Sequence, residues 1–256
     1  MRVVFLCAPV LSEFNVKVIE TFFRTDRHSV CGCLVDGRPA EQLRDRLWRN
    51  LRRGRGGYVA VMAVNALRRR RAPVVDTEAF FGACGISTVV TDEPYGAGIR
   101  IISEWQPDVL LLLGGFGIIK EPLLSAAPHR VLSYHHGDVR RYRGMPPAFW
   151  ELYNGESEMG ITVQRIAAQL DAGEPILERQ ILLRRGDTLG AVQKRAFDES
   201  VDMLLGAVDR LGEPDFRPSP VDQLGRLYTL PNLRQWLRLH AMLAARRREG
   251  RVRTLN

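Results

Sequence analysis

The sequence predicts an α/β fold: a Rossmann-like, mostly parallel twisted sheet with helices on both faces and a short C-terminal extension. Two observations and one general rule support this prediction. Apolar runs of strand length alternate with segments whose apolar residues recur at helical spacing. Strands joined through helices form right-handed crossovers, which make neighbouring strands parallel. Finally, 45% of the 256 residues are hydrophobic, which is enough to build a sizeable core.

The first half of the chain contains four predicted strands and three predicted helices. The strands cover residues 3–7, 29–35, 87–91 and 109–113. The helices cover residues 13–24, 76–83 and 97–104. The fourth strand is entirely apolar, as expected of a parallel strand covered on both faces. Ala8 and Pro9 follow the first strand where a dinucleotide site would need glycines, so binding of NAD or FAD is not expected.

The second half of the chain continues the alternation of strands and helices and then ends in a linker and a helical extension. Its predicted strands cover residues 131–132, 160–166 and 175–183. Its predicted helices cover 148–154, a single long 189–211 capped by Thr188, and 233–248. Prolines mark a linker between the last two helices. We expect one catalytic domain over residues 1–212, with a basic helical insertion at 41–71, and a linker with a short helical extension over 213–256.

Arginine clusters give the chain a net charge of +8 and a pI near 9.8. The clusters lie within residues 44–55, 68–71 and 246–253. Clustered arginine attracts phosphate-rich partners such as nucleic acid, anionic lipid or a phosphorylated substrate, and the alternative is an ordinary solvated surface. No apolar run approaches the ~18 residues of a membrane span, so any membrane contact would be peripheral.

The cysteines indicate a reducing compartment. Cys7, Cys31, Cys33 and Cys84 are too few and too scattered for a disulfide scaffold, and we expect all four to be reduced core thiols. This favours a cytoplasmic protein. The histidines, cysteines and carboxylates show no metal-ligand spacing, so a metal site is not expected.

The most informative segment is SYHHGD, residues 133–138, at the exit of a strand in the middle of the chain. Open α/β sheets bind ligands at such strand ends. Alternation along an extended segment places Ser133 and His135 on one face and Tyr134 and His136 on the other. A distant carboxylate, Asp171, could meet the histidine and support acid–base chemistry on a carbonyl. Taken alone, the segment at 133–138 could also be an ordinary strand end, and the segment around Asp171 could be an ordinary turn.

Five segments, in order, resemble the 10-formyltetrahydrofolate-dependent formyltransferases, a family that includes glycinamide ribonucleotide, methionyl-tRNA and sugar N-formyltransferases. They are LGGFGII at 113–119, SYH at 133–135, YRG at 142–144, NGE and GITV within 154–163, and LDAG at 170–173. The resemblance covers about residues 1–210 and is strongest between 109 and 183.

The resemblance implies an enzyme that transfers the formyl group of 10-formyltetrahydrofolate to a small-molecule amine, whose identity stays open. His135 would donate to the developing oxyanion, and Asp171 would favour the charged imidazole or take up the amine proton. The implied folate contacts are Phe116, Gly117, Ile118, Ile119, Gln169 and Leu170. Residues 221–256 are short for the C-terminal barrel of the tRNA enzymes, so a nucleic acid acceptor is not expected.

One departure concerns catalysis. Ser133 stands where the family has an asparagine whose amide is a second oxyanion donor, and a serine hydroxyl is a shorter donor. Tyr134, His136 and Asp138 are candidate replacements. Two alternatives therefore stay open: a formyltetrahydrofolate hydrolase, and a degenerate relative that only binds folate or an anion.

Overall fold

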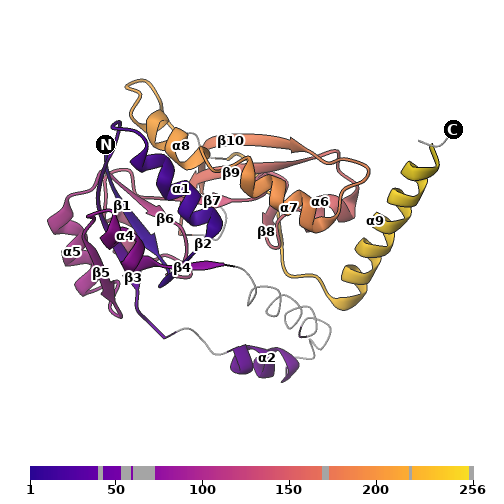
Figure 1. Ribbon diagram of the computed structural model, residues 1–256, viewed down its shortest axis with the longest axis horizontal. Helices are drawn as coiled ribbons and strands as arrows, with labels where there is room; N and C mark the ends of the chain where they lie inside the picture. The colour runs from indigo at the N-terminus through magenta and orange to yellow at the C-terminus, as the bar shows by residue number, and fades with distance from the viewer. Residues whose placement is uncertain (40–42, 53–58, 60–72, 169–172, 219–220, 254–256) are drawn as a thin grey trace.

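The computed structural model describes residues 1–39, 43–52, 59, 73–168, 173–218 and 221–253, and its centre is a seven-stranded sheet (Figure 1). The strand order is β10-β9-β7-β6-β1-β3-β5. The strands are β1 (Arg2–Cys7), β3 (Ser29–Asp36), β5 (Thr88–Thr91), β6 (Val109–Leu112), β7 (Val131–His135), β9 (Glu158–Arg165) and β10 (Glu174–Leu182). The first five are parallel, and β9 runs antiparallel to both β7 and β10. The predicted fold class is confirmed.

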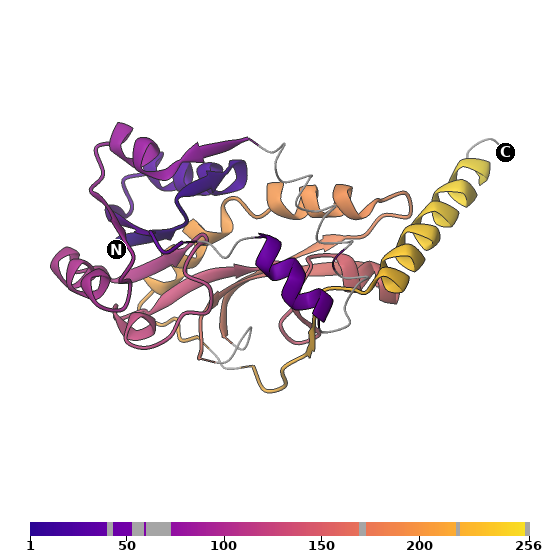
Figure 2. The same cartoon turned by 90° about the horizontal axis from the view of Figure 1, so that it is seen from below.

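Helices cover both faces of this sheet, and Figure 2 shows the two layers edge-on. One face carries α1 (Glu13–Phe23), α4 (Thr77–Ala83), α7 (Leu189–Asp198) and α8 (Met203–Leu211). The other carries α5 (Ala97–Trp105) and the short helix η1 (Leu123–Ser125). Each face has its own apolar cluster because successive residues of every strand point to opposite sides. Leu110 belongs to the same cluster as Ile102 of α5, whereas Leu111 belongs to the cluster that contains Val18 of α1.

Polar side chains fix where three of these helices begin. Ser12, Asp76 and Thr188 each accept a hydrogen bond from the backbone N–H three residues later, at the start of α1, α4 and α7. Such caps satisfy N–H groups that have no partner within the helix. The cap predicted at Thr188 is confirmed.

The predicted single helix over 189–211 is wrong, because the chain forms α7 and α8 with a break at 199–202. The Tyr134 hydroxyl occupies this break: it donates to the Ser200 carbonyl at 2.7 Å and accepts from the Leu204 N–H at 3.0 Å. One side chain on β7 thus satisfies a carbonyl within the break and an N–H group in the first turn of α8. Apolar spacing alone did not reveal this, because it continues through the break.

Two small sheets were not predicted. β2 (Val10–Ser12) pairs with β4 (Val74–Asp76), and β8 (Tyr142–Gly144) pairs with β11 (Arg226–Tyr228). The C-terminal residues therefore return to the loop that follows β7. The remaining helices are α2 (Leu43–Arg52), α6 (Phe149–Asn154) and α9 (Leu233–Arg253). Of the predicted insertion at 41–71, α2 and residue 59 are described, and the rest lies outside the described residues.

The cysteine prediction needs one correction. Cys7 and Cys33 are buried and Cys31 is half-buried, but Cys84 is exposed at the end of α4 rather than in the core. Within the part of the chain that the structure describes, no helix has the length and apolar character needed to span a bilayer.

Candidate active site

The candidate site lies where β1, β6 and β7 end and their loops begin, at the edge of the sheet where parallel α/β folds bind ligands. The loop after β6 is held close to β1. A Cβ on Gly115, whose φ is +82°, would lie 3.0 Å from the Cys7 carbonyl oxygen, so only glycine allows this approach. Arg38, at the end of β3, donates to the Phe116 carbonyl at 3.1 Å. The loop is thus fixed from two neighbouring strands.

The predicted folate residues of this loop have different environments. Phe116 and Ile119 are each 2% exposed and pack in the core with Leu110 and Leu123. Ile118 is 58% exposed. Of the three apolar side chains, only that of Ile118 is free to contact a ligand in this arrangement. The other two anchor the loop to the sheet.

His135 is the last residue of β7 and is only 6% exposed. Its Nε2 lies 2.7 Å from the Tyr142 carbonyl oxygen. Because a carbonyl only accepts, Nε2 carries the proton, and Nδ1 is the nitrogen that can gain or lose one. Gly137 leaves room for this ring, since a Cβ there would lie 2.6 Å from Nε2. The local sequence thus fixes the tautomer and orientation of the imidazole.

His136 has a structural environment on the opposite face, as strand alternation predicted. Its ring stacks on Tyr134 and contacts Phe14 and Phe197. Its Nε2 lies 3.2 Å from the Ser200 hydroxyl. Burial among these rings, with a smaller contribution from His135, lowers the pKa of His136 to about 3. His136 is therefore neutral at physiological pH and packs in the core.

The strand β9 contributes polar side chains that the sequence analysis did not single out. In the antiparallel pairing, Thr162 lies opposite His135 and Gln164 lies opposite Ser133, so the four side chains share one face of the sheet. The Thr162 hydroxyl donates to the Gly137 carbonyl at 3.0 Å. Gln164 is 4% exposed, and its Oε1 has no hydrogen-bond partner among the described residues. Only the register of β7 and β9 reveals this arrangement.

Of the segment LDAG at 170–173, the structure describes only Gly173. Gln169, Leu170 and Asp171 lie outside the described residues, so the structure does not place them relative to His135. A Cβ on Gly173 would overlap the Arg165 carbonyl oxygen and lie 2.9 Å from Gln164 Oε1. The chain therefore enters β10 against the end of β9, directly beside Gln164.

The loop after β7 is tied to the segment 154–156. The Tyr142 hydroxyl donates to Glu156 at 2.7 Å and accepts from the Asn154 amide at 3.0 Å. Arg141 forms an ion pair with the same glutamate at 2.7 Å. The Tyr142 carbonyl holds His135. The contacts of Asn154 and Glu156 with Tyr142 therefore help to fix the orientation of the imidazole.

The C-terminal strand β11 also holds this loop. The Met145 N–H donates to the Tyr228 carbonyl at 3.3 Å, and the Tyr228 ring stacks on those of Tyr142 and Trp150. Gly144, the last residue of β8, pairs with Tyr228 and has a φ of +90°. A Cβ at this position would overlap the Tyr228 carbonyl oxygen. The close pairing of β8 and β11 thus requires glycine here.

Gly144→Ala should therefore destabilise the protein by at least about 1–2 kcal/mol, because the left-handed backbone and the overlap with Tyr228 both oppose a methyl group. Urea unfolding measures the effect. Gly186→Ala is the matched control, since a Cβ there meets no atom within 4 Å and φ is not positive. Equal unfolding midpoints for the two variants would show that β11 does not need this close approach.

Arg143, also in β8, is a buried cation. Its side chain is 9% exposed, and its Nε and Nη1 have no hydrogen-bond partner among the residues described. Buried guanidinium groups are normally paired, because an unsatisfied charge away from water is costly. An anion bound beside β8 would supply the missing partner. The residue follows directly after Tyr142, whose carbonyl holds His135.

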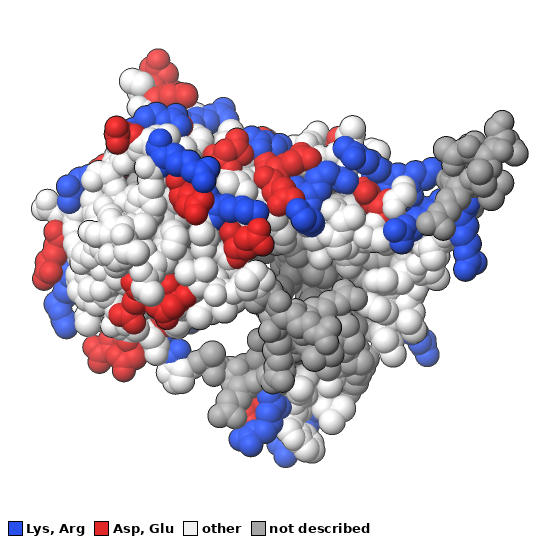
Figure 3. Space-filling model, in the orientation of Figure 1, with Lys and Arg blue, Asp and Glu red and all other residues white. Residues whose placement is uncertain are grey.

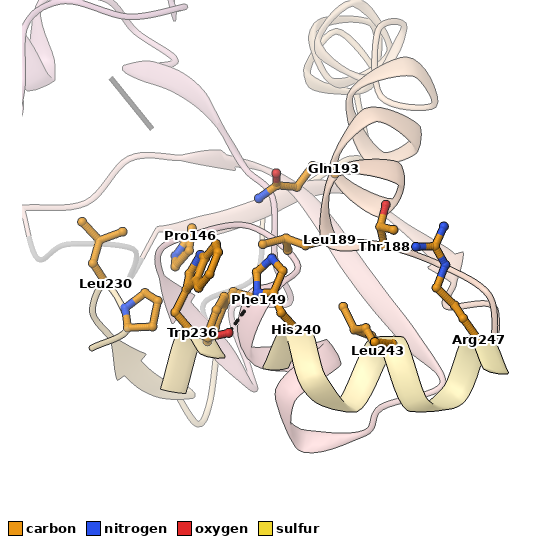
Figure 4. A pocket seen from close by; sticks show the side chains of 13 residues that line it. Pro146, Phe149, Thr188, Leu189, Gln193, Leu230, Trp236, His240, Leu243 and Arg247 are labelled. Atoms are coloured by element: carbon orange, nitrogen blue, oxygen red, sulfur yellow. Dashed lines mark hydrogen bonds between the residues drawn. The ribbon is translucent and has the colours of Figure 1, made fainter. Parts of the chain in front are cut away.

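A separate cavity of about 360 Å³ lies between α7 and α9 (Figure 4). Trp236 and His240 of α9 stack with ring centroids 3.8 Å apart and line it together with Phe149 and Leu189. None of the sequence-predicted site residues that the structure describes lines this cavity. It belongs to the packing of α9 on the domain and not to the site at His135.

Comparison with known proteins agrees with the geometry. The sequence model of the formyl transferase family matches residues 96–208. The methionyl-tRNA formyltransferase of Roseiflexus castenholzii is 26% identical over 231 residues, covering 90% of this chain and 64% of that protein. This chain thus spans less than two thirds of that relative's length.

Solved structures show the same fold. Glycinamide ribonucleotide transformylase 1 from Symbiobacterium toebii superimposes with a TM-score of 0.58 at 20% identity, covering 87% of this chain and 94% of that one. The N-formyltransferase from Helicobacter canadensis, in complex with folinic acid and dTDP-3-aminofucose, gives 0.59 at 11% identity, covering 90% and 71%. At these identities the likeness concerns the fold alone.

Proposed function

We propose that the chain is an N-formyltransferase, because residues 96–208 match the sequence model of the formyl transferase family. It moves the formyl group of 10-formyltetrahydrofolate to the amine of an acceptor. The observation that carries the proposal is the position of His135 at the end of β7, where the Tyr142 carbonyl fixes the ring through Nε2 and so makes Nδ1 the nitrogen that acts on the substrate. The reaction is that of a catalytic domain over residues 1–212, extended by 213–256, in the cytoplasm.

The proposed reaction forms and breaks one bond at the formyl carbon. The acceptor nitrogen attacks that carbon, and the carbonyl oxygen becomes an oxyanion that His135 Nδ1–H stabilises. The amine loses its proton to Asp171, directly or through water. The intermediate then collapses: the bond to N10 breaks, N10 takes up a proton, and tetrahydrofolate leaves. Ser133, beside His135 on the same face, contributes a hydroxyl to this site.

For the folate we propose that the loop after β6 and the residues following β9 form the two walls of the binding site. Ile118 and the backbone of Gly117 contact the pterin, whereas Phe116 and Ile119 hold the loop from below. Gln169 and Leu170 provide backbone groups for the ring edge. A flat ring with polar edges needs this combination of apolar contact and backbone hydrogen bonds.

An anionic acceptor is supported by Arg143. A phosphate or carboxylate on the acceptor would pair with a guanidinium that is buried and lacks partners at two nitrogens among the described residues. Arg247 and Arg248 of α9 are exposed and fit the alternative of a solvated surface. Figures 1 and 3 show α9 and its basic side chains at the end of the molecule away from the N-terminal strands.

The proposal predicts that purified protein releases tetrahydrofolate from 10-formyltetrahydrofolate only when an amine is added. Phosphorylated amino sugars and other anionic amines should give faster release than neutral amines of equal size, because only the former pair with Arg143. Absorbance of the folate follows the reaction. Release into water without an amine would instead identify a hydrolase. Folate binding without any release would identify a degenerate binding protein.

A further inference from the structure

Formyl transfer needs hydrogen-bond donors around the oxygen that becomes negatively charged, and a site that lacks one such donor loses much of its rate. His135 provides one donor. Ser133 is a poor second one: it is half-buried, and its hydroxyl already lies 3.4 Å from the Tyr134 carbonyl. The structure shows which other side chain can take this role.

The three candidate replacements for the missing donor, which lie close to Ser133 in sequence, already have other contacts. Tyr134 and His136 lie on the opposite face, where the Tyr134 hydroxyl bridges the break between α7 and α8 and the His136 ring packs among aromatic rings. Asp138 accepts from the Arg140 N–H at 2.8 Å, and a carboxylate cannot donate to an oxyanion. These contacts exclude all three as donors toward the face that carries His135.

Gln164 is on the required face. It pairs with Ser133 in the register of β7 and β9, so its side chain rises from the neighbouring strand beside position 133. Neighbouring strands are only ~4.8 Å apart, and the two-carbon stem of glutamine carries the carboxamide across part of that distance. Thr162, the other polar residue of β9 on this face, already donates to the Gly137 carbonyl.

The carboxamide oxygen of Gln164 is buried without a hydrogen-bond partner among the described residues. The side chain is 4% exposed, yet Oε1 makes no hydrogen bond to any residue that the structure describes. A buried amide oxygen without a partner is costly, and in native structures a catalytic role is one of the few explanations for such a group. A half-turn of the amide exchanges its oxygen and nitrogen, so the same group can present an N–H.

We propose that Gln164 is a catalytic residue, whose amide N–H donates a hydrogen bond to the formyl oxygen as it becomes an oxyanion. The carboxamide that Ser133 lacks is thereby supplied from β9 instead of β7. This inference rests on the proposed function, because it assigns a role within the same reaction. Together, His135 and Gln164 provide donors from two adjacent strands to one oxygen.

Gln164→Met tests the assignment, because methionine has similar length and volume but cannot donate. We expect kcat to fall about 10²–10³-fold with little change in KM for 10-formyltetrahydrofolate. Gln180→Met, an exposed glutamine on β10, is the matched control and should retain wild-type kinetics. In Ser133→Asn/Gln164→Met, an asparagine restores a carboxamide on the same face, and we expect at least a tenfold recovery. A merely structural glutamine would not be rescued in this way.

Binding measurements separate failure of this inference from failure of the proposed function. Folinic acid contacts the folate site without reaction, so calorimetry should give equal affinities for the wild type and Gln164→Met. A folate analogue with a hydrated aldehyde in place of the formamide mimics the tetrahedral intermediate, and the variant should bind it at least tenfold more weakly. No binding of folinic acid by the wild type would contradict the proposed function. If folinic acid binds and both proteins bind the aldehyde equally, Gln164 is not the donor.

Discussion

Replacing His135 with glutamine should lower kcat about 10²–10⁴-fold and leave KM for 10-formyltetrahydrofolate nearly unchanged. A glutamine amide can still donate to the Tyr142 carbonyl, which the imidazole Nε2 contacts at 2.7 Å. It cannot exchange a proton at the position of Nδ1. The variant thus keeps the local hydrogen bond and removes only the acid–base function. Steady-state kinetics, with urea unfolding to confirm an intact fold, measures both.

His136→Phe is the control for this experiment. The His136 ring lies among Phe14, Tyr134 and Phe197, and a phenyl ring suits that environment. Because burial lowers the pKa of His136 to about 3, the substitution removes no charge at neutral pH. We expect kcat within a few-fold of the wild type. Retention of more than a tenth of the activity in His135→Gln, or an equal loss in His136→Phe, would remove His135 from the mechanism.

The choice between these two histidines illustrates what the sequence could predict. Alternation along an extended segment depends only on local geometry, so it placed His135 and His136 on opposite faces correctly. The apolar run at 109–113 likewise predicted β6 because a parallel strand buried on both faces has few alternatives. Both inferences use the chemistry of consecutive residues.

Features that depend on distant parts of the chain were not predictable in the same way. β8 and β11 are three residues long and pair across more than 80 positions, so neither has the apolar alternation that predicts a strand. The break between α7 and α8 depends on a hydroxyl from β7. Gln164 became a candidate only through the register that sets it opposite Ser133. The meeting of His135 with Asp171 stays a prediction, because Asp171 lies outside the described residues.

Glu151→Gln should stabilise the protein at pH 8 by up to about 3 kcal/mol relative to the wild type and have little effect near pH 4. Glu151 is on α6 and is 3% exposed. Burial, reinforced by the negative charge of Glu156, raises its pKa from 4.5 to about 7. Between these two values the folded state binds more protons than the unfolded state. Stability therefore falls as the pH rises through this window, and above it the full cost of the buried charge is present.

A glutamine at 151 is neutral at every pH, so the variant should lose this dependence. Urea unfolding of both proteins at pH 4, 6 and 8 gives the difference in unfolding free energy. Glu104→Gln, which neutralises an exposed carboxylate on α5, should show no comparable gain at pH 8. A constant difference between wild type and Glu151→Gln across the three pH values would mean that the carboxyl group does not titrate in the folded protein. A difference that grows with pH places the buried proton at Glu151, whose pKa is also affected by the charges of Glu156 and Arg141.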